Sequence, residues 1–489
     1  MLCRSARRIL FSHPSDDQFR NELREMCQVD QAHLLMLAQQ SIVPRSSVNR
    51  LLAAIERIKA EDFEALRRRE STRGLYFLYE DYLIETEGTQ AGGILQTARS
   101  RNDLNATLLK RKLRRPYLCL LHQALRLDAV LLRRARKFAQ VIMPAYTHGQ
   151  AAMPITYGHY LAGVAQALLR DSDALFEAAK GMQSCPLGAG AVAGTSIPID
   201  TALTARLLGF DSDPLNSVDA VASRDLVLRL LAAMAIYSLT LSRLASDLLQ
   251  WTTAEFDFLH LPDELVGCSS AMPQKRNPFL LEHIQGRSAS ALGTFIQAAA
   301  ATHAMPFTNS IAVGTEAAKS IWTAFQDLTE IVILMRLVIA GAQPNAQAML
   351  ERNVKGFTAA TAFANRLMVE ADIDFRRAHS LVGEAVLESL QSGNDFHQVL
   401  SSSLRDRGYS VSFAGLDLHS IVCSLEYGGG PGPSSLKNCL NNLCEQWAGQ
   451  YRRKKSQDQF WQQADIRLNQ SVQDFHASAQ LEEASSLMG

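Results

Sequence analysis

Three short segments gather polar residues in predicted loops that contain glycine or proline and flank long helices. They are TARSRND (Thr97–Asp103), PAYTHGQAAMP (Pro144–Pro154) and GCSSAMPQKRNP (Gly267–Pro278). Serine hydroxyls, an imidazole and basic side chains are groups that proteins use to transfer protons and to stabilise developing negative charge. Catalysis is often found at residues of this kind in loops that rigid helices position. The three segments therefore predict an active site.

Each segment has a simpler explanation when it is taken alone. SRND could be a helix N-terminus with a capping asparagine. A lone loop histidine such as His148 is more often a satisfied surface or core residue, and KRNP is more often a solvated turn.

Two other patterns resemble cofactor sites but lack the structural context of such sites. Gly188–Ala193 (GAGAVA) mimics a dinucleotide fingerprint, but no strand is predicted before it and no βαβ unit surrounds it. The pair Glu282-His283 lacks the HExxH spacing that would place two metal ligands on one helical face. The sequence therefore predicts neither a metal site nor an organic cofactor.

The elements that must position the three segments are long helices. Between Ser217 and Leu261 there is no glycine or proline, and Leu226–Trp251 is apolar nearly all round, so this helix must be buried among others. Four more long helices are predicted, over Asn102–Ile142 (with Pro116 inside), Ile155–Lys180, Phe279–Thr302 and Ala317–Ile339. Since one subunit does not cover the apolar faces of such helices, we expect side-by-side oligomerisation.

Shorter helices flank this central block. They are expected at Asp30–Gln40, at Ser46–Arg57, twice within Thr358–Ser392, and from Leu436 to about Gln473 after a break at Ser424–Ser435 and before a frayed tail. The absence of a strand-rich region predicts an all-α fold. We expect three domains, a mainly helical domain (1–103), a central long-helix bundle (104–353) and a helical C-terminal domain (354–489).

Composition narrows the classes of function. The chain has 489 residues, 49 Lys+Arg against 49 Asp+Glu and a pI of about 7.2, so it lacks the charge excess expected of a protein that binds nucleic acid or an anionic membrane. No apolar run reaches about 18 residues, which argues against a transmembrane helix. Eight cysteines without a CxxC pair predict reduced thiols and a cytoplasmic protein. Arg4, Arg7 and Arg8 leave a short organellar presequence open.

In their order and spacing, the three segments resemble the signature regions of the argininosuccinate lyase branch of the fumarase/aspartase superfamily. The signature GSSxMPxKxNP is matched except at its first glycine, where this chain has Cys268. Further resemblances lie at Gln31–Leu37, Pro186–Gly194, Asn216–Asp225 and Asp374–Val386. Three chance matches in family order are improbable, which favours function over the simpler explanations. The resemblance implies a fumarase/aspartase-type three-domain subunit in a homotetramer, with each active site built from three chains.

The resemblance also implies β-elimination from a substituted succinate, with release of fumarate. Loss of the weakly acidic Cβ proton builds charge on the adjacent carboxylate, so fixed cations such as Lys275 must stabilise it. By resemblance Ser269 is the general base, which requires backbone N–H groups near its oxygen and closure of the loop Asp263–Ala271. His148, held by Glu282, would assist proton transfer on the amine side. The implied substrate-binding residues are Ser100, Arg101, Asn102, Thr147, Ser270, Asn277, Gln96 and Asn309.

Two stretches depart from the family pattern. Gln96 stands where the family motif HTGRSRND has its histidine, and a glutamine cannot carry charge or shuttle a proton. The segment Met305–Glu316 (MPFTNSIAVGTE) replaces LPLAYNKDLQED. Its changed positions include Asn309 for tyrosine, Ile311 for lysine, Ala312 for aspartate and Gly314 for glutamine. The half of the site that binds fumarate is thus kept, whereas the half that binds the amine is largely rewritten.

Three functions stay open from the sequence. The first is a carbon–nitrogen lyase that cleaves argininosuccinate or a similar N-substituted aspartate to fumarate and an amine such as arginine. The second is a specialised biosynthetic lyase with a different nitrogen leaving group, and the third is a catalytically silent family member. The third is opposed by six intact site residues, Thr147, His148, Ser269, Lys275, Asn277 and Glu282.

Overall fold

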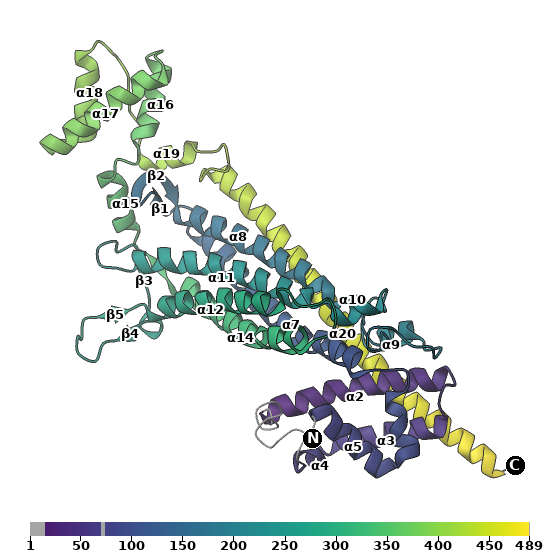
Figure 1. Cartoon of the computed structure of the whole chain (residues 1–489). Coiled ribbons are helices and arrows are strands. Elements are labelled where there is room, and N and C mark those ends of the chain that lie inside the picture. The colour runs from purple at the N-terminus through teal and green to yellow at the C-terminus, as the bar shows by residue number, and fades with distance from the viewer. Residues whose placement is uncertain (1–14, 70–73, 489) are drawn as a thin grey trace.

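The computed structural model describes residues 15–69 and 74–488, and most of them lie in helices (Figure 1). The strands in this part of the chain are short and form two-stranded sheets, so the predicted all-α class is confirmed. The basic residues Arg4, Arg7 and Arg8, on which the expectation of a presequence depends, lie outside the described residues.

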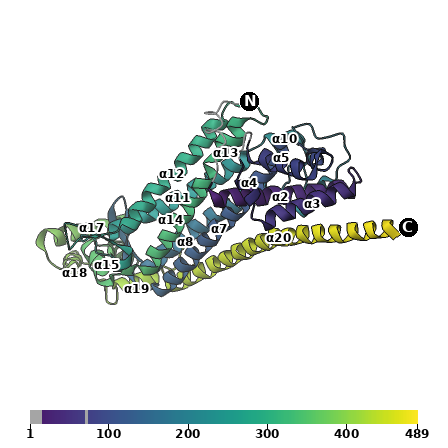
Figure 2. The same ribbon diagram turned by 90° about the horizontal axis from the view of Figure 1, so that it is seen from below.

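Long helices pack side by side in the centre of the molecule (Figures 1 and 2). They are α7 (Arg101–Lys137), α8 (Tyr157–Ala178), α11 (Asp225–Trp251), α12 (Phe279–Thr302) and α14 (Ile321–Gly341). They share one apolar core, in which Leu120, Leu168 and Leu230 are fully buried. By length and composition α11 could span a membrane, but it packs within this core. The predicted long helices are thereby confirmed, and α12 has the predicted bounds.

Between α7 and α8 the chain forms a hairpin. β1 (Ile142–Thr147) and β2 (Gln150–Thr156) pair antiparallel, with Pro144 opposite Pro154. The predicted helices overlap this hairpin at Ile142 and at Ile155–Thr156 and are wrong there, because these residues pair between the two strands. Thr156 then caps α8 by accepting a backbone N–H bond.

Two smaller strand pairs close loops of the bundle. β3 (Leu259–His260) pairs with β6 (Gln343–Pro344), and β4 (Gly267–Cys268) pairs with β5 (Arg276–Asn277). The helix predicted from Ala317 is interrupted at Ser320. A π-helical turn η4 (Ala312–Glu316) and the short α13 (Ala317–Lys319) precede α14.

The N-terminal helices form a second apolar cluster beside the bundle. They are α2 (Asp16–Gln39), α3 (Arg45–Ala60), α4 (Glu64–Arg67), α5 (Leu75–Glu87), α6 (Thr89–Gly92) and the 3₁₀ turn η1 (Gly93–Gln96). Both helices predicted here lie within α2 and α3, although α2 starts earlier. Three short elements link α8 to α11, namely η2 (Ala179–Met182), α9 (Thr201–Leu207) and α10 (Ser217–Ala222).

The C-terminal part contains a compact helical cluster and one very long helix. The cluster comprises α16 (Ala360–Glu370), α17 (Phe375–Ser392) and α18 (Phe396–Asp406), flanked by α15 (Ala346–Lys355) and α19 (Leu418–Ser424). The last helix, α20 (Pro433–Met488), runs back along the bundle to the N-terminal helices (Figure 2). The expected end near Gln473 is wrong, because Leu468, Val472 and Phe475 are buried in the N-terminal cluster and the helix continues past them.

Candidate active site

The SRND segment forms the N-terminus of α7. Ser100 is its N-cap, and the Oγ of Ser100 accepts the N–H of Asn102 at 3.2 Å. The N–H of Ser100 in turn donates to Asp103 Oδ1 at 3.1 Å, which completes a capping box. The simpler explanation of SRND as a helix start is therefore correct, although the capping residue is the serine and not the asparagine.

Buried polar contacts fix this helix start from both sides. The guanidinium of Arg99 donates to Asp30 Oδ1 at 2.6 Å and to the hydroxyl of Tyr76 at 2.5 Å. Burial raises the pKa of Asp30, and the charge of Arg99 opposes that rise. Asp103 Oδ2 accepts the N–H groups of Gly188 at 2.9 Å and Gly190 at 3.0 Å. The glycine-rich segment Gly188–Ala193, which resembles a dinucleotide fingerprint, is therefore a loop that fixes the start of α7.

Three of the predicted substrate-binding residues meet at this end of the bundle. Asn309 Nδ2 donates to Asn102 Oδ1 at 2.9 Å. This bond joins the segment Met305–Glu316, which departs from the family pattern, to the start of α7 beside Ser100. Gln96 ends η1 nearby and is half-buried, and the Arg101 guanidinium lies 4.2 Å from the centroid of the Phe77 ring.

Thr147 and His148 lie at the turn of the β1–β2 hairpin. Both are exposed, and His148 has a φ of 51°, followed by Gly149 with a φ of 74°. Left-handed backbone at a residue other than glycine is uncommon and often marks a functional position. This turn lies within the predicted segment Pro144–Pro154, whereas the strands that present it were not predicted.

Ser269 lies in the loop between β4 and β5. Its Oγ accepts the backbone N–H groups of Ala271 at 3.3 Å and Met272 at 3.0 Å. One side of the loop is held by Arg276, whose guanidinium pairs with Asp263 and donates to the carbonyl of Leu261 at 2.8 Å. Two backbone N–H groups of the same loop therefore donate to the serine oxygen, a contact that would also stabilise an alkoxide.

The remaining candidate residues lie in the same loop or just after it in the sequence. Ser270 and Lys275 are exposed, and Asn277 in β5 is half-buried. Glu282 lies in the first turn of α12, which begins after Pro278 as predicted, and it too is exposed. Within one described chain no hydrogen bond joins Glu282 to His148.

One chain alone does not unite these groups. Ser100 precedes α7 and His148 follows it, and a helix of 37 residues is about 55 Å long at about 1.5 Å per residue. The Ser100–Asn102–Asn309 group therefore lies at the opposite end of the bundle from the hairpin turn. The two groups do not come together within one described chain.

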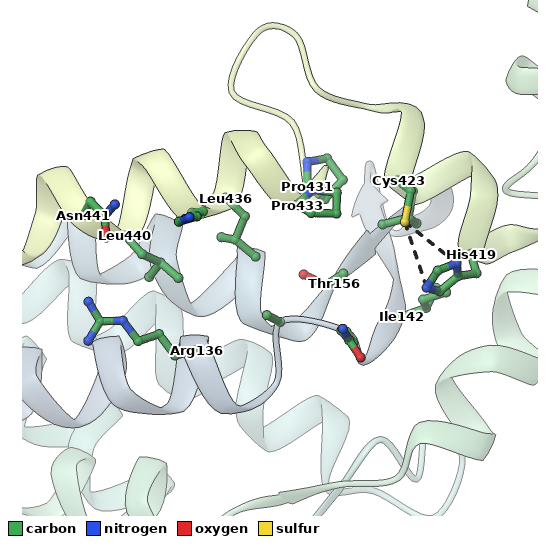
Figure 3. Close-up of a pocket in the computed structure, with 14 residues that line it drawn as sticks. Arg136, Ile142, Thr156, His419, Cys423, Pro431, Pro433, Leu436, Leu440 and Asn441 are labelled. Atoms are coloured by element: carbon green, nitrogen blue, oxygen red, sulfur yellow. Dashed lines mark hydrogen bonds between the residues drawn. The ribbon is translucent and has the colours of Figure 1, made fainter.

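A separate cavity of about 510 Å³ lies between the end of α7, the hairpin and the beginning of α20 (Figure 3). Arg136, Ile142, His419, Cys423 and Leu436 are among its lining residues. None of the predicted site residues lines it.

The sequence matches known families along most of its length. A family model described as Lyase matches residues 35–293, and one described as Argininosuccinate lyase C-terminal matches residues 357–422. The argininosuccinate lyase of Methanocorpusculum labreanum is 34% identical over 422 residues, 84% of this chain and 85% of the relative. That of Azotobacter vinelandii is 32% identical over 410 residues, 83% of this chain and 88% of the relative.

Solved structures show the same fold. EDDS lyase in complex with formate superposes with a TM-score of 0.84 at 25% identity, covering 98% of this chain and 99% of that one. Class II fumarase from Schistosoma mansoni gives a TM-score of 0.66 at 15% identity, covering 80% and 88%. The matched families and the curated relatives show that the chain belongs to the argininosuccinate lyase family.

Proposed function

We propose that the protein is a carbon–nitrogen lyase, which cleaves an N-substituted aspartate such as argininosuccinate and releases fumarate. Family membership supports this reaction class. The observation that carries the mechanism is the environment of Ser269, whose Oγ accepts two backbone N–H groups. Donors aimed at a serine oxygen stabilise its alkoxide and allow it to act as a base.

The candidate residues have different roles in the proposed reaction, which depend on the proton or the charge that each one binds. Ser269 takes the Cβ proton, the freed electron pair forms the double bond, and the C–N bond breaks. Lys275 and Asn277 supply a cation and an amide for the charge that builds on the adjacent carboxylate. His148 serves the departing nitrogen, which must gain a proton as it leaves.

We also propose a homotetramer with active sites shared between subunits. Only five residues of α12 are buried although the helix is apolar, and Leu292 and Ile296 are 38% and 57% exposed. Gly286 and Gly293 on the same helix have no atom within 4 Å of the position that a Cβ would take, so another helix could approach closely there. Such an uncovered apolar face favours association, and the separation of the candidate residues between the two ends of the bundle supports sites that are shared between chains.

The first test is the absorbance of the conjugated double bond of fumarate after the protein is mixed with argininosuccinate. A steady rise supports the proposal and shows that Gln96 is tolerated. Without a rise, the reverse reaction with fumarate and a panel of amines should reduce the absorbance with one of them. That result would identify a different leaving group, whereas silence in both directions would contradict the proposed activity.

The cytoplasm is the compartment that fits this function. Argininosuccinate and fumarate are small, charged metabolites, and the charge-balanced composition carries no excess that would favour a membrane surface. Fractionation of cells that express the natural protein would test this location.

A further inference from the structure

The cavity between the end of α7, the hairpin and the beginning of α20 has an apolar interior (Figure 3). Val422, Leu436 and Leu440 line it and are buried, and Ile142 and Pro431 add further apolar surface. Small-molecule sites are typically cavities of about 300–1,000 Å³ with a mostly apolar lining and a few polar groups. At about 510 Å³ this cavity is large enough for a small organic ligand.

Polar side chains lie at two ends of this interior. Arg136 of α7 and Lys437 of α20 line the cavity and are exposed, and Asn441 follows Lys437 after one helical turn. In Figure 3 Arg136 and Asn441 lie together at one end, whereas His419 and Cys423 lie at the other. The cavity therefore combines a buried apolar interior with a basic rim, formed by Arg136 and Lys437.

The charges of the basic rim have no acidic partner in the described chain. None of the described residues that line the cavity is acidic. Arg136 Nη2 donates to Cys444 Sγ at 2.9 Å, and neither Arg136 nor Lys437 pairs with a carboxylate within residues 15–69 and 74–488. Two carboxylates of the adjoining segments are engaged elsewhere, since Glu426 accepts two backbone N–H groups at the start of α20 and Asp417 accepts one as the N-cap of α19. Two cations without acidic partners favour a negatively charged ligand.

The geometry points to a binding site for an amphipathic carboxylate. The carboxylate binds at the basic rim, where a guanidinium can hold it with two parallel hydrogen bonds. The apolar chain of the ligand fills the interior against Val422, Leu436 and Leu440, which removes its surface from water. Both parts of the ligand are needed, because an inorganic anion leaves the apolar interior empty and a neutral hydrocarbon leaves the basic rim unpaired.

Within one chain this site is separate from the candidate active-site residues. Ile142 and Thr156, which line the cavity, pair at the open end of the hairpin, whereas His148 lies at its turn. The 6 residues of β1 separate the two ends by about 17 Å at about 3.3 Å per residue. The inference therefore does not depend on the proposed lyase activity, and binding measurements alone can test it.

The first test is calorimetric titration of the full-length protein with three probes. Decanoate has both a carboxylate and a long apolar chain, acetate has only the carboxylate, and 1-decanol lacks the charge. We expect decanoate to bind at least about 10-fold more tightly than either of the others, the gain typical of one charge-assisted hydrogen bond. Equal affinity for decanoate and 1-decanol would overturn the inference, and so would the absence of decanoate binding.

Substitution of the basic rim tests its role. Arg136→Gln combined with Lys437→Gln removes both charges at exposed positions, so the fold should be retained, and the affinity for decanoate should fall at least about 10-fold. Arg133→Gln is the matched control, since Arg133 is an exposed arginine of the same helix that does not line the cavity. It should leave the affinity unchanged. An unchanged affinity in the double variant would contradict a carboxylate bound at the rim.

Cys423 allows the position of the bound ligand to be tested in the unaltered protein. Its Sγ lies 3.8 Å from His419 Nδ1, and both side chains lie at the end of the cavity opposite Arg136 (Figure 3). At about ten times its Kd, decanoate should slow the alkylation of Cys423 by N-ethylmaleimide about 10-fold, which peptide mass spectrometry measures. Cys119, which is exposed on α7 and does not line the cavity, should react at the same rate with and without decanoate. Unchanged alkylation of Cys423, or equal slowing at both cysteines, would show that decanoate binds elsewhere and would overturn the assignment of this cavity.

Discussion

At the scale of single residues, Ser269 is the position on which the chemistry depends. Ser269→Ala removes the oxygen that accepts the N–H groups of Ala271 and Met272 but leaves the β4–β5 pairing intact. We expect kcat to fall at least about 10²-fold, a typical loss for a general base. Fumarate release by the purified variant measures this.

The neighbouring variant Cys268→Ser serves as its control, because Cys268 lies in β4 and is exposed. It should change kcat little. A Ser269→Ala enzyme with wild-type kcat would show that another group takes the proton.

Much of the candidate site could be predicted at this scale, since its residues lie in short segments whose order is recognisable. Arg99 and Asp103 were missed as positioning residues although they belong to one of those segments. Their partners, Asp30 and the N–H groups of Gly188 and Gly190, lie far away in the sequence, so only the fold shows them.

At the scale of elements, the Arg99–Asp30 pair anchors the start of α7 on α2. Both side chains are fully buried, so Arg99→Met leaves the Asp30 carboxylate without a counter-charge. We expect a loss of about 3–5 kcal/mol in the free energy of unfolding, measured by denaturant titration. The exposed pair of Arg68 and Glu64 is the comparison, and Arg68→Ala should cost less than about 1 kcal/mol. Similar losses in both variants would show that the pair does not act as an anchor.

The buried carboxyl group of Asp128 should make the stability of the helix bundle depend on pH. It is fully buried in α7 with neither carboxyl oxygen hydrogen-bonded, and burial, reinforced by the charge of Asp171, raises its pKa well above the usual value. The folded state therefore holds this proton more tightly than the unfolded state. The stabilising contribution is present below the unfolded pKa of about 3.9 and is lost as pH rises through the folded pKa.

Asp128→Asn removes this titration. Relative to wild type, the variant should gain stability as pH rises from about 5 to 8, which thermal unfolding at several pH values measures. Asp173→Asn, at an exposed position of α8, should show no such trend. A difference in Tm between wild type and Asp128→Asn that does not vary with pH would mean that the carboxyl group titrates alike in both states.

The elements themselves were predictable where the apolar period was long and unbroken. α11 and α12 were therefore expected nearly at their bounds, whereas the β1–β2 hairpin was not. Its strands are short, and their pairing depends on contacts across the turn that a helical period does not reveal. The end of α20 was missed because its buried residues cover the distant α2 and α3, not their own neighbours in sequence.

At the scale of the whole molecule, the uncovered face of α12 should hold the subunits together. Leu292→Lys combined with Ile296→Lys places two charges on that face, and we expect the sedimentation mass to fall from about four chains toward the 53.9 kDa of one, with loss of activity. The comparison is Leu387→Lys with Leu390→Lys, which alters two leucines of α17 that are 59% and 61% exposed. That variant should keep its mass, and a wild type of 53.9 kDa would refute the tetramer.

The distance between the two ends of the bundle leads to a sharper test of shared sites. Asn102→Ala and Ser269→Ala damage opposite ends, so each homotetramer should be inactive because every site lacks one residue. If sites combine residues of different chains, subunits that are mixed, unfolded and refolded together should form some sites with both residues intact. Activity should then return to a fraction of the wild-type value, set by the mixing ratio. No recovery in tetramers that contain both variants would mean that Asn102 and Ser269 of one chain serve the same site. The length of α12 argues against this, because its 24 residues, about 36 Å at about 1.5 Å per residue, lie between the Ser269 loop and Asn309, the partner of Asn102.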